Sequence, residues 1–249
     1  DQLPHSPESA ALALADRLDT LIGIFGIGQV PTGSKDPFAL RRASLAVIRI
    51  LLAFAPMANL EMILTTAKQS FPSGVLDEDV VATVKAYLLD RLPAHYEEQG
   101  VSVDILRSVT AVGTETIGDI DCRSLAVANF AGSDAANALA VANKRVANIL
   151  TKVGETLPTI NQDLLTETAE LKLRAALIES QASLNVAVAD NDYPQALSNL
   201  AKLREPVDAF FDNVLVNADD MSVRLNRLAL LQELRCQFLK VADLAVLAR

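Results

Sequence analysis

Aromatic side chains are scarce in this sequence: they make up 4% of its 249 residues, and tryptophan is absent. Hydrophobic residues nevertheless account for 51% of the chain, and alanine and leucine dominate them. Alanine and leucine favour helices, whereas strands are enriched in β-branched and aromatic residues. So apolar a chain of this length can bury the core of one large domain or two ordinary ones, which excludes a disordered protein. We therefore predict an all-α fold built of helical bundle domains.

Histidine is nearly absent as well, which removes most catalytic and metal-binding chemistry. His5 lies close to the N-terminus and His95 follows Pro93 in a polar turn. We expect His95 to lie at the surface. No carboxylate–histidine cluster has the spacing of metal ligands, and no Ser/His/Asp or Cys/His set can be assembled from the chain. We therefore expect no catalytic residue and no metal site.

Only two cysteines occur, Cys122 and Cys236, and they are far apart in the sequence. Two reduced thiols in a cytoplasmic protein are the simple interpretation, with a single disulfide as the alternative. No apolar run reaches the roughly 18 residues that a membrane span needs. The most apolar stretch, "LAVIRILLAFAPMANL", is interrupted by Arg49 and ended by Pro56. We therefore expect a cytoplasmic location and no membrane partner.

Positive charge is also in short supply. The chain has 22 lysines and arginines against 31 aspartates and glutamates, a net charge of −9. A broad electropositive surface for nucleic acid is thereby excluded, because such a surface needs excess positive charge to attract the phosphate backbone. Any nucleic acid that this chain binds has to be held by a local basic patch.

The stretch "GIFGIGQVPTGSKDPFALRR", residues 23–42, looks at first like a phosphate-binding loop. A P-loop requires G-x-x-x-x-G-K-[ST] after a strand, but residues 28–35 read G-Q-V-P-T-G-S-K, with serine and lysine exchanged. Pro31 removes an amide that would bind phosphate, and it replaces the third glycine of a dinucleotide fingerprint. We interpret the stretch as a turn that breaks one helix, capped at its start by Ser9, before Asp36 and Pro37 begin another.

One helix stands out from the acidic background. The sequence predicts it from about Ala135 through "NALAVANKRVANILTKV". One face is apolar, and the opposite arc has no acidic residue and carries Asn137, Lys144, Arg145, Asn148 and Lys152. Two interpretations stay open for this arc: an ordinary solvated face, or a stripe that contacts phosphates and bases.

The last helix, predicted from Asp220 almost to the C-terminus, places arginines beside its apolar side. Its solvent-facing side is predicted to consist of Asn226, Glu233, Gln237 and Lys240. Arg224, Arg227 and Arg235 instead project next to leucines. Arginines in such positions usually pair with carboxylates, for which the candidates are Asp208, Asp212, Asp219 and Asp220. The alternative is a groove that presents arginine to an unpaired base.

Four stretches together resemble the β subunit of the bacterial, two-subunit glycyl-tRNA synthetases. They run in order from about Ala10 almost to the C-terminus: "ALADRLDTLIGIFGIGQVPTGSKDPFALRRASLAVIRIL", "YLLDRLPAHYEEQGVSVDIL", "ANKRVANIL" and "PVDAFFDNVLVNADDMSVRLNRLALL". The family's β subunit is much longer, and this chain begins without methionine. The chain is thus similar to the C-terminal part of that subunit.

The resemblance implies three segments. Residues 1–72 would be the end of a domain similar to HD phosphohydrolases, in which Asp16 corresponds to the last acidic metal ligand. Because the histidine–aspartate pair of such a site would lie upstream, no metal is assigned here. Residues 73–134 would form a helical linker or body. Residues 135–249 are similar to the helical anticodon-binding domain of arginyl-tRNA synthetases.

The resemblance also implies a function. Glycyl-adenylate would form at the α subunit, which uses ATP, so this segment would carry neither catalytic residues nor a cofactor. Its partners would be glycine tRNA and the α subunit of an α2β2 enzyme, and not DNA. Because glycine anticodons carry two cytosines, we expect acidic and basic side chains together at the site. A helical scaffold that binds only protein is the alternative function.

We predict tRNA contacts at two places in the chain. Lys144, Arg145, Asn148, Lys152, Arg224 and Arg227 belong to the anticodon-binding-like segment. Lys35, Arg41 and Arg42, from the glycine-containing stretch, are predicted to contact the tRNA backbone.

Overall fold

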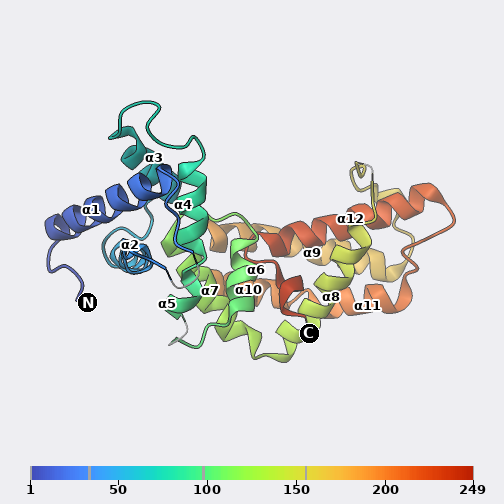
Figure 1. The fold of residues 1–249 in the computed structure, drawn as a ribbon. Helices are drawn as coiled ribbons and strands as arrows, with labels where there is room; N and C mark the ends of the chain where they lie inside the picture. Colours follow the sequence, from blue (N-terminus) through green and yellow to red (C-terminus); the bar gives the residue numbers. More distant parts are fainter. Residues whose placement is uncertain (1, 33–34, 97–98, 155, 249) are drawn as a thin grey trace. The chain divides into compact units, whose positions relative to one another are not determined.

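Helices form nearly all of the regular structure in a computed structural model of the protein (Figure 1). The structure describes residues 2–32, 35–96, 99–154 and 156–248. Over these ranges no strand forms, and the only β-type pairings are isolated bridges that join Thr32 to Lys35 and Asn59 to Thr116. The predicted all-α class is therefore confirmed. None of the helices in the same ranges combines the length and the apolar character that crossing a bilayer requires.

The chain divides into two compact units. Unit 1 comprises residues 1–102 and 114–121, and unit 2 comprises residues 103–113 and 122–249. These units do not coincide with the expected segments 1–72, 73–134 and 135–249. The difference arises because residues 80–89 form a helix that packs on the first and third helices of unit 1.

Unit 1 is built around its first helix. Its elements are α1 (Pro7–Gly26), α2 (Leu40–Phe54), α3 (Leu60–Gln69), α4 (Val80–Leu89), α5 (Leu92–Tyr96) and the start of α7 (Ile117–Ala131). Helix α1 packs against α2, α3 and α4. Leu21 and Ile22 of α1 and Leu40 and Ile48 of α2 are fully buried there. Burying apolar side chains between these helices is the main source of the unit's stability.

The two helices that flank the glycine-containing stretch begin differently from the prediction. Ser6, not Ser9, is the N-cap of α1: its hydroxyl accepts from the Ser9 amide, and the Ser9 hydroxyl accepts from the Ser6 amide. Ala39, not Asp36, is the N-cap residue of α2, although the Asp36 carboxylate accepts from the amides of Leu40 and Arg41 at 2.8 and 3.0 Å. The helix starts three residues later than expected, because a turn with Ala39 in the left-handed conformation intervenes.

Gly23 and Gly26 lie within α1, and the break in the glycine-containing stretch comes after them. The helix continues through both and ends before Gly28, whose φ of 77° is the left-handed conformation that glycine tolerates best. Gly26 has a different role. A Cβ at this position would lie 2.5 Å from Leu76 Cδ2, so the absence of a side chain allows Leu76 to pack directly on the helix.

Unit 2 is a bundle in which long helices lie side by side. Its elements are α6 (Val103–Thr110), the remainder of α7, α8 (Asp134–Leu150), the short 3₁₀ helix η2 (Gln162–Leu164), α9 (Thr168–Ala189), α10 (Tyr193–Ala201), α11 (Arg204–Asn213), α12 (Met221–Leu239) and the 3₁₀ helix η3 (Leu244–Leu247). Helix α9 packs on α10, α11 and α12, and α8 packs on α12 and η3. Figure 1 shows α9 and α12 running alongside each other.

Local sequence sets where the two helices of greatest functional interest begin. Ser133 caps α8 by accepting from the Ala136 amide at 3.1 Å. Asp220 caps α12 by accepting from the Ser222 amide at 2.8 Å. Such caps satisfy amides that have no partner inside the helix. The predicted starts near Ala135 and at Asp220 are therefore confirmed.

The packing at Gly26 gives a prediction about stability. Gly26→Ala should lower the free energy of unfolding by about 1–3 kcal/mol, because the new methyl group overlaps Leu76. Gly23→Ala is the matched control in the same helix, since its Cβ would meet only the Phe71 ring, at 3.2 Å, and a ring can shift slightly. Denaturant unfolding measures both. Equal stability of the two variants would contradict the assigned role of Gly26.

Candidate nucleic-acid interface

A groove with a volume of about 600 Å³ lies on unit 2 between α8, α12 and the segment that joins α11 to α12. We call it the basic groove. Its lining residues are Val141, Lys144, Arg145, Asn148, Ile149, Lys152, Val153, Val214, Leu215, Val216, Asn217, Arg224 and Leu228. Five of the residues predicted to contact RNA therefore share one groove. The spacing of Lys144 and Asn148 along α8 explains part of this, because residues four apart lie on one helix face, and Lys152 follows just after the helix ends.

The lining residues of the basic groove have charge of one sign. Lys144, Arg145, Lys152 and Arg224 are exposed and positive, and no aspartate or glutamate is among the lining residues. In a chain with a net charge of −9, four cations around one groove make the local basic patch that nucleic-acid binding requires. Cations on low-dielectric apolar walls attract anions more strongly than isolated surface charges do.

Two of these cations are held in place by neighbouring groups. The Arg145 guanidinium lies over the Phe211 ring of α11, 4.2 Å from the ring centre. This stacking leaves the guanidinium exposed while fixing its plane. Lys144 donates from Nζ to the carbonyl of Ala248 at 2.9 Å. The groove therefore presents at least one oriented arginine plane, which is a platform on which an unpaired base can stack.

Amides, not carboxylates, supply the acceptors of the groove. The sequence led us to expect acidic and basic side chains together for reading cytosine, but the lining residues include no acid. Asn148 and Asn217 line the groove instead. Each amide side chain has one carbonyl acceptor and two N–H donors. Such a group can meet the amino donor and the acceptors of a cytosine edge without adding negative charge beside phosphates.

The outward face of α12 differs from the prediction. Asn226 and Gln237 were expected to face solvent, yet they are 1% and 2% exposed. Asn226 accepts from the Asn161 amide at 2.7 Å and donates to the Asn161 carbonyl at 3.0 Å. Gln237 bonds to Ser180 and to the carbonyl of Leu177. The prediction failed because α9 and the loop before it cover this side of α12, which helical periodicity alone does not reveal.

Arg227 lies inside unit 2 and not in the groove. Its side chain is 9% exposed and pairs with Glu170 of α9, whose side chain is 0% exposed. It also donates to the carbonyl of Leu215 at 2.8 Å. Arg227 therefore pairs with a carboxylate, as one of the two interpretations predicted, although Glu170 was not among the expected partners. Arg224, one turn earlier, lines the groove.

Arg235 also pairs with a carboxylate that the sequence did not single out. Its two terminal nitrogens donate to the carboxylate of Asp243 at 2.8 and 2.6 Å. Burial acts to raise the pKa of Asp243, but the hydrogen bonds and charge of Arg235 outweigh it and hold the pKa below its ordinary value. Of the four aspartates proposed as partners, Asp208 lies 3.8 Å from Arg204 on the same helix.

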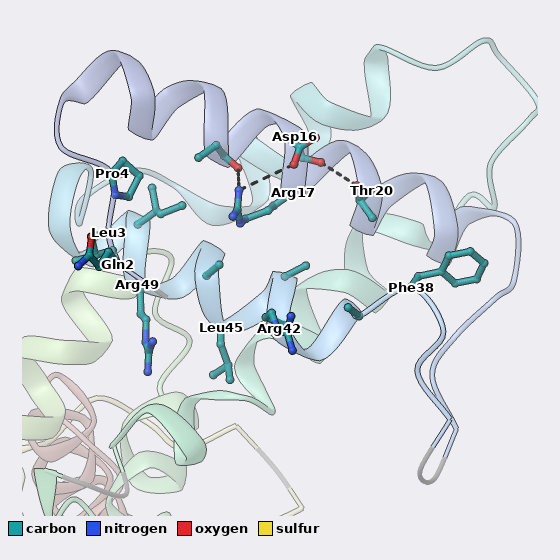
Figure 2. A pocket seen from close by; sticks show the side chains of 15 residues that line it. Gln2, Leu3, Pro4, Asp16, Arg17, Thr20, Phe38, Arg42, Leu45 and Arg49 are labelled. Atoms are coloured by element: carbon teal, nitrogen blue, oxygen red, sulfur yellow. Dashed lines mark hydrogen bonds and ion pairs between the residues drawn. The ribbon is translucent and has the colours of Figure 1, made fainter.

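The predicted tRNA contacts of the first segment lie in unit 1 and are not part of the basic groove. Lys35 is exposed in the turn between α1 and α2, where its backbone pairs with Thr32. Arg41 is half-buried at the start of α2. Arg42 lines a separate cavity of about 360 Å³ between α1 and α2, together with Arg17 and Arg49. Figure 2 shows Arg42 and Arg49 along α2, and Arg17 bonded to the α1 backbone and close to Asp16.

Asp16 does not sit among metal ligands in this structure. Its side chain is 78% exposed, and its nearest charged partner is Arg17 at 4.0 Å. Across the described ranges, no group of three histidine, cysteine, aspartate or glutamate side chains is placed to hold a metal ion. These residues do not fit a metal site, so we derive no chemistry from one.

His95 is half-buried in α5, in contrast to the surface position expected from the sequence. Its ring packs edge-on against Tyr96, with the ring centres 4.9 Å apart. Burial and then the charge of Arg49 lower the pKa of His95, against the opposing effect of Asp121. We assign His95 no catalytic role.

Sequence reasoning did not identify three of the residues that shape the groove. Phe211, Leu215 and Asn217 come from α11 and the segment that follows it, far in sequence from α8. The adjacent phenylalanines at 210 and 211 gave a partial signal. Neighbouring residues of a helix point in different directions, so only one of the two can face the core of the bundle and the other is left for a surface contact. The partner of Arg227 also had a signal, since Glu167 and Glu170 have the spacing of a capping box.

Two known families match different parts of the chain. Residues 1–111 match the family described as "Glycyl-tRNA synthetase beta subunit". Residues 139–244 match the family described as "DALR anticodon binding domain". The second match spans every lining residue of the basic groove.

Individual relatives extend the similarity over the whole chain. The "Glycine--tRNA ligase beta subunit" of Haemophilus influenzae is 45% identical over 247 residues. The proteins of the same name from Pectobacterium carotovorum and Shewanella oneidensis are 47% and 46% identical over 248 residues. In each case the alignment covers 99% of this chain and 36% of the relative, so the chain spans about a third of the length of these relatives.

The buried position of Asn226 predicts a selective effect on stability. Asn226→Ala should lower the free energy of unfolding by about 1–3 kcal/mol, because the amide and carbonyl of Asn161 lose their partner. Gln232→Ala, at an exposed position of the same helix, should change it by less than about 0.5 kcal/mol. Denaturant unfolding compares the two. Equal losses of stability in the two variants would contradict a stabilising role for the two hydrogen bonds between Asn226 and the Asn161 backbone.

Proposed function

Because the chain belongs to the glycyl-tRNA synthetase beta-subunit family, we propose that it is a tRNA-binding part of a glycine–tRNA ligase. The anticodon region of glycine tRNA lies in the basic groove of unit 2. Glycine activation with ATP takes place on a separate α subunit, with which the whole β subunit forms an α2β2 enzyme in the cytoplasm. This chain supplies recognition, and none of its residues takes part in the chemical step.

One observation carries the proposal: four cations and two amides line a single groove without an acidic residue, within the segment matched by the anticodon-binding family. Lys144, Lys152 and Arg224 are suited to phosphates, which give affinity without sequence information. Asn148 and Asn217 are suited to base edges. Phosphate contacts and base contacts are therefore available side by side, as recognition of a single-stranded loop requires.

Apolar groups complete the groove. Val141 and Leu215 line it and are 60% and 72% exposed. Leaving large apolar side chains in water gains nothing for a site that binds only phosphates. Together with the Arg145–Phe211 stack, they offer a surface for the flat faces of unpaired bases. An anticodon loop presents both unpaired bases and a phosphate backbone.

Binding of tRNA is expected to depend on the anticodon. Glycine tRNA should bind more tightly than the same tRNA with both anticodon cytosines replaced by adenines. The expected difference is at least tenfold, since base-edge contacts contribute about 1–3 kcal/mol each. Gel shifts at several salt concentrations measure this. Equal, steeply salt-dependent affinities would refute the anticodon contact, and no binding of either RNA at low salt would refute tRNA binding.

Removing two cations from the groove should weaken binding without affecting the fold. Lys144→Ala with Arg145→Ala should reduce affinity for glycine tRNA and flatten its salt dependence by about 1.4 in the log–log slope, or about 0.7 for each phosphate contact to a single strand. Thermal stability should stay close to that of the wild type, since both residues are exposed.

The matched control replaces one lysine and one arginine elsewhere on unit 2. Lys172 and Arg204 are exposed and do not line the groove. Lys172→Ala with Arg204→Ala removes the same charge, so a general electrostatic effect would weaken binding equally in both double variants. That result would favour the other interpretation of the basic residues on α8, an ordinary solvated face.

A further inference from the structure

A buried ion pair holds one wall of the basic groove. Arg227 of α12 donates from Nε to the carboxylate of Glu170 on α9, and from a terminal nitrogen to the carbonyl of Leu215 at 2.8 Å. Leu215 lies in the segment that joins α11 to α12, and residues 214–217 of this segment line the groove. A residue outside the groove is therefore bonded directly to the backbone of its wall.

The other oxygen of Glu170 is also occupied. It accepts from the amides of Thr166 and Glu167, at 2.9 and 2.8 Å. The carboxylate is therefore fixed by the two residues immediately before α9, and Arg227 is fixed by the carboxylate. A side chain that is bonded at both ends of its guanidinium cannot change rotamer without leaving Glu170 charged and unpaired inside the bundle.

The wall has few other polar anchors. The Val214 amide donates to the carbonyl of Phe210 at 2.9 Å, at the end of α11. Beyond it, within the described part of the chain, the backbone of residues 215–219 makes no hydrogen bond to another backbone group. The hydrogen bond from Arg227 to the Leu215 carbonyl is thus a polar contact that holds the backbone of this wall in place. The buried side chains of Val214 and Val216 supply its apolar contacts.

We propose that Arg227 is a positioning residue for RNA recognition, which holds the Leu215–Asn217 wall of the groove without touching RNA. This inference rests on the proposed function of the groove. The wall carries Leu215, an exposed apolar side chain, and Asn217, one of the two amides, and it lines the same groove as Lys144 and Arg145 of α8. If the wall moves, an amide that reads a base edge loses its alignment, whereas the cations that bind phosphates keep theirs.

Arginine suits this role because its planar guanidinium donates in two fixed directions at once. Lysine has a single ammonium group and cannot reproduce the geometry that joins Glu170 to Leu215. Arg227→Lys therefore keeps the charge beside Glu170 but loosens the wall. Glu170→Gln is a second variant, which keeps the shape of the side chain but removes its charge and replaces one of its two acceptor oxygens with an N–H₂ donor.

The test compares Arg227→Lys with Arg174→Lys. Arg174 pairs with Glu233 between the same two helices, α9 and α12, but makes no bond to the groove wall. Affinity for glycine tRNA is measured from low to moderate salt, at a temperature where circular dichroism shows every variant to be folded. Order parameters from ¹⁵N relaxation report the motion of residues 215–217 in the absence of RNA.

Arg227→Lys should bind glycine tRNA about tenfold more weakly, with an unchanged salt slope and lower order parameters at residues 215–217, because no phosphate contact is lost. Glu170→Gln should change affinity in the same direction, and Arg174→Lys should bind as the wild type does. Unchanged affinity in folded Arg227→Lys would overturn the inference, leaving the pair a purely structural feature. A salt slope lowered by about one would also overturn it, since that would indicate direct phosphate contact.

The two proposals fail in distinguishable ways. If the wild-type protein binds no RNA at low salt, the proposed function is refuted, and the RNA part of this inference with it. The order parameters still decide whether Arg227 holds the wall. Unchanged order parameters in both Arg227→Lys and Glu170→Gln would refute the positioning role even if tRNA binds well.

Discussion

Glu170 and Arg227 are opposite charges buried together in the helical bundle of unit 2, and each offsets the cost of burying the other. Desolvating either charge alone would cost several kcal/mol, on the order of the net stability of a domain. Their contact is supported at both ends, by amides at the start of α9 and by the Leu215 carbonyl. The pair therefore fixes the relation of α9, α12 and the segment before α12. The basic groove is one consequence of that arrangement, because this segment forms one of its walls.

The net negative charge of the chain and its basic groove are compatible because electrostatic attraction is local. Salt screens surface charges over about 8–10 Å at ordinary ionic strength, so distant carboxylates weaken an RNA site only slightly. The immediate lining matters more, and it contains four cations and no acid. Amides at Asn148 and Asn217 provide acceptors without repelling phosphates. An acidic protein can in this way present a basic site while disfavouring indiscriminate binding to nucleic acid.

The glycine-containing stretch has a structural role in unit 1. Its glycines allow Leu76 to pack closely on α1 and allow the chain to turn at Gly28, and the Asp36 carboxylate then accepts from the first amides of α2. None of these features binds a ligand by itself. Packing and turn formation therefore account for the residues of this stretch. This explains how the stretch can be distinctive in sequence without containing a phosphate-binding motif.

The sequence by itself determined the helical class, the starts of α8 and α12, and the row of basic residues along α8. These follow from contacts within a few residues of the chain: apolar periodicity, capping side chains, and the 3.6-residue turn that aligns Lys144 with Asn148. Only the tertiary structure decided that Arg224 faces the groove while Arg227, three residues later, is buried against Glu170. It also decided that Asn226 and Gln237 are covered and that Phe211 supports Arg145. The physical reason is that the residues packed against α12 decide which of its polar side chains are buried. The partners of Asn226, Arg227 and Gln237 lie 57 to 65 residues away in the sequence, beyond the reach of local patterns.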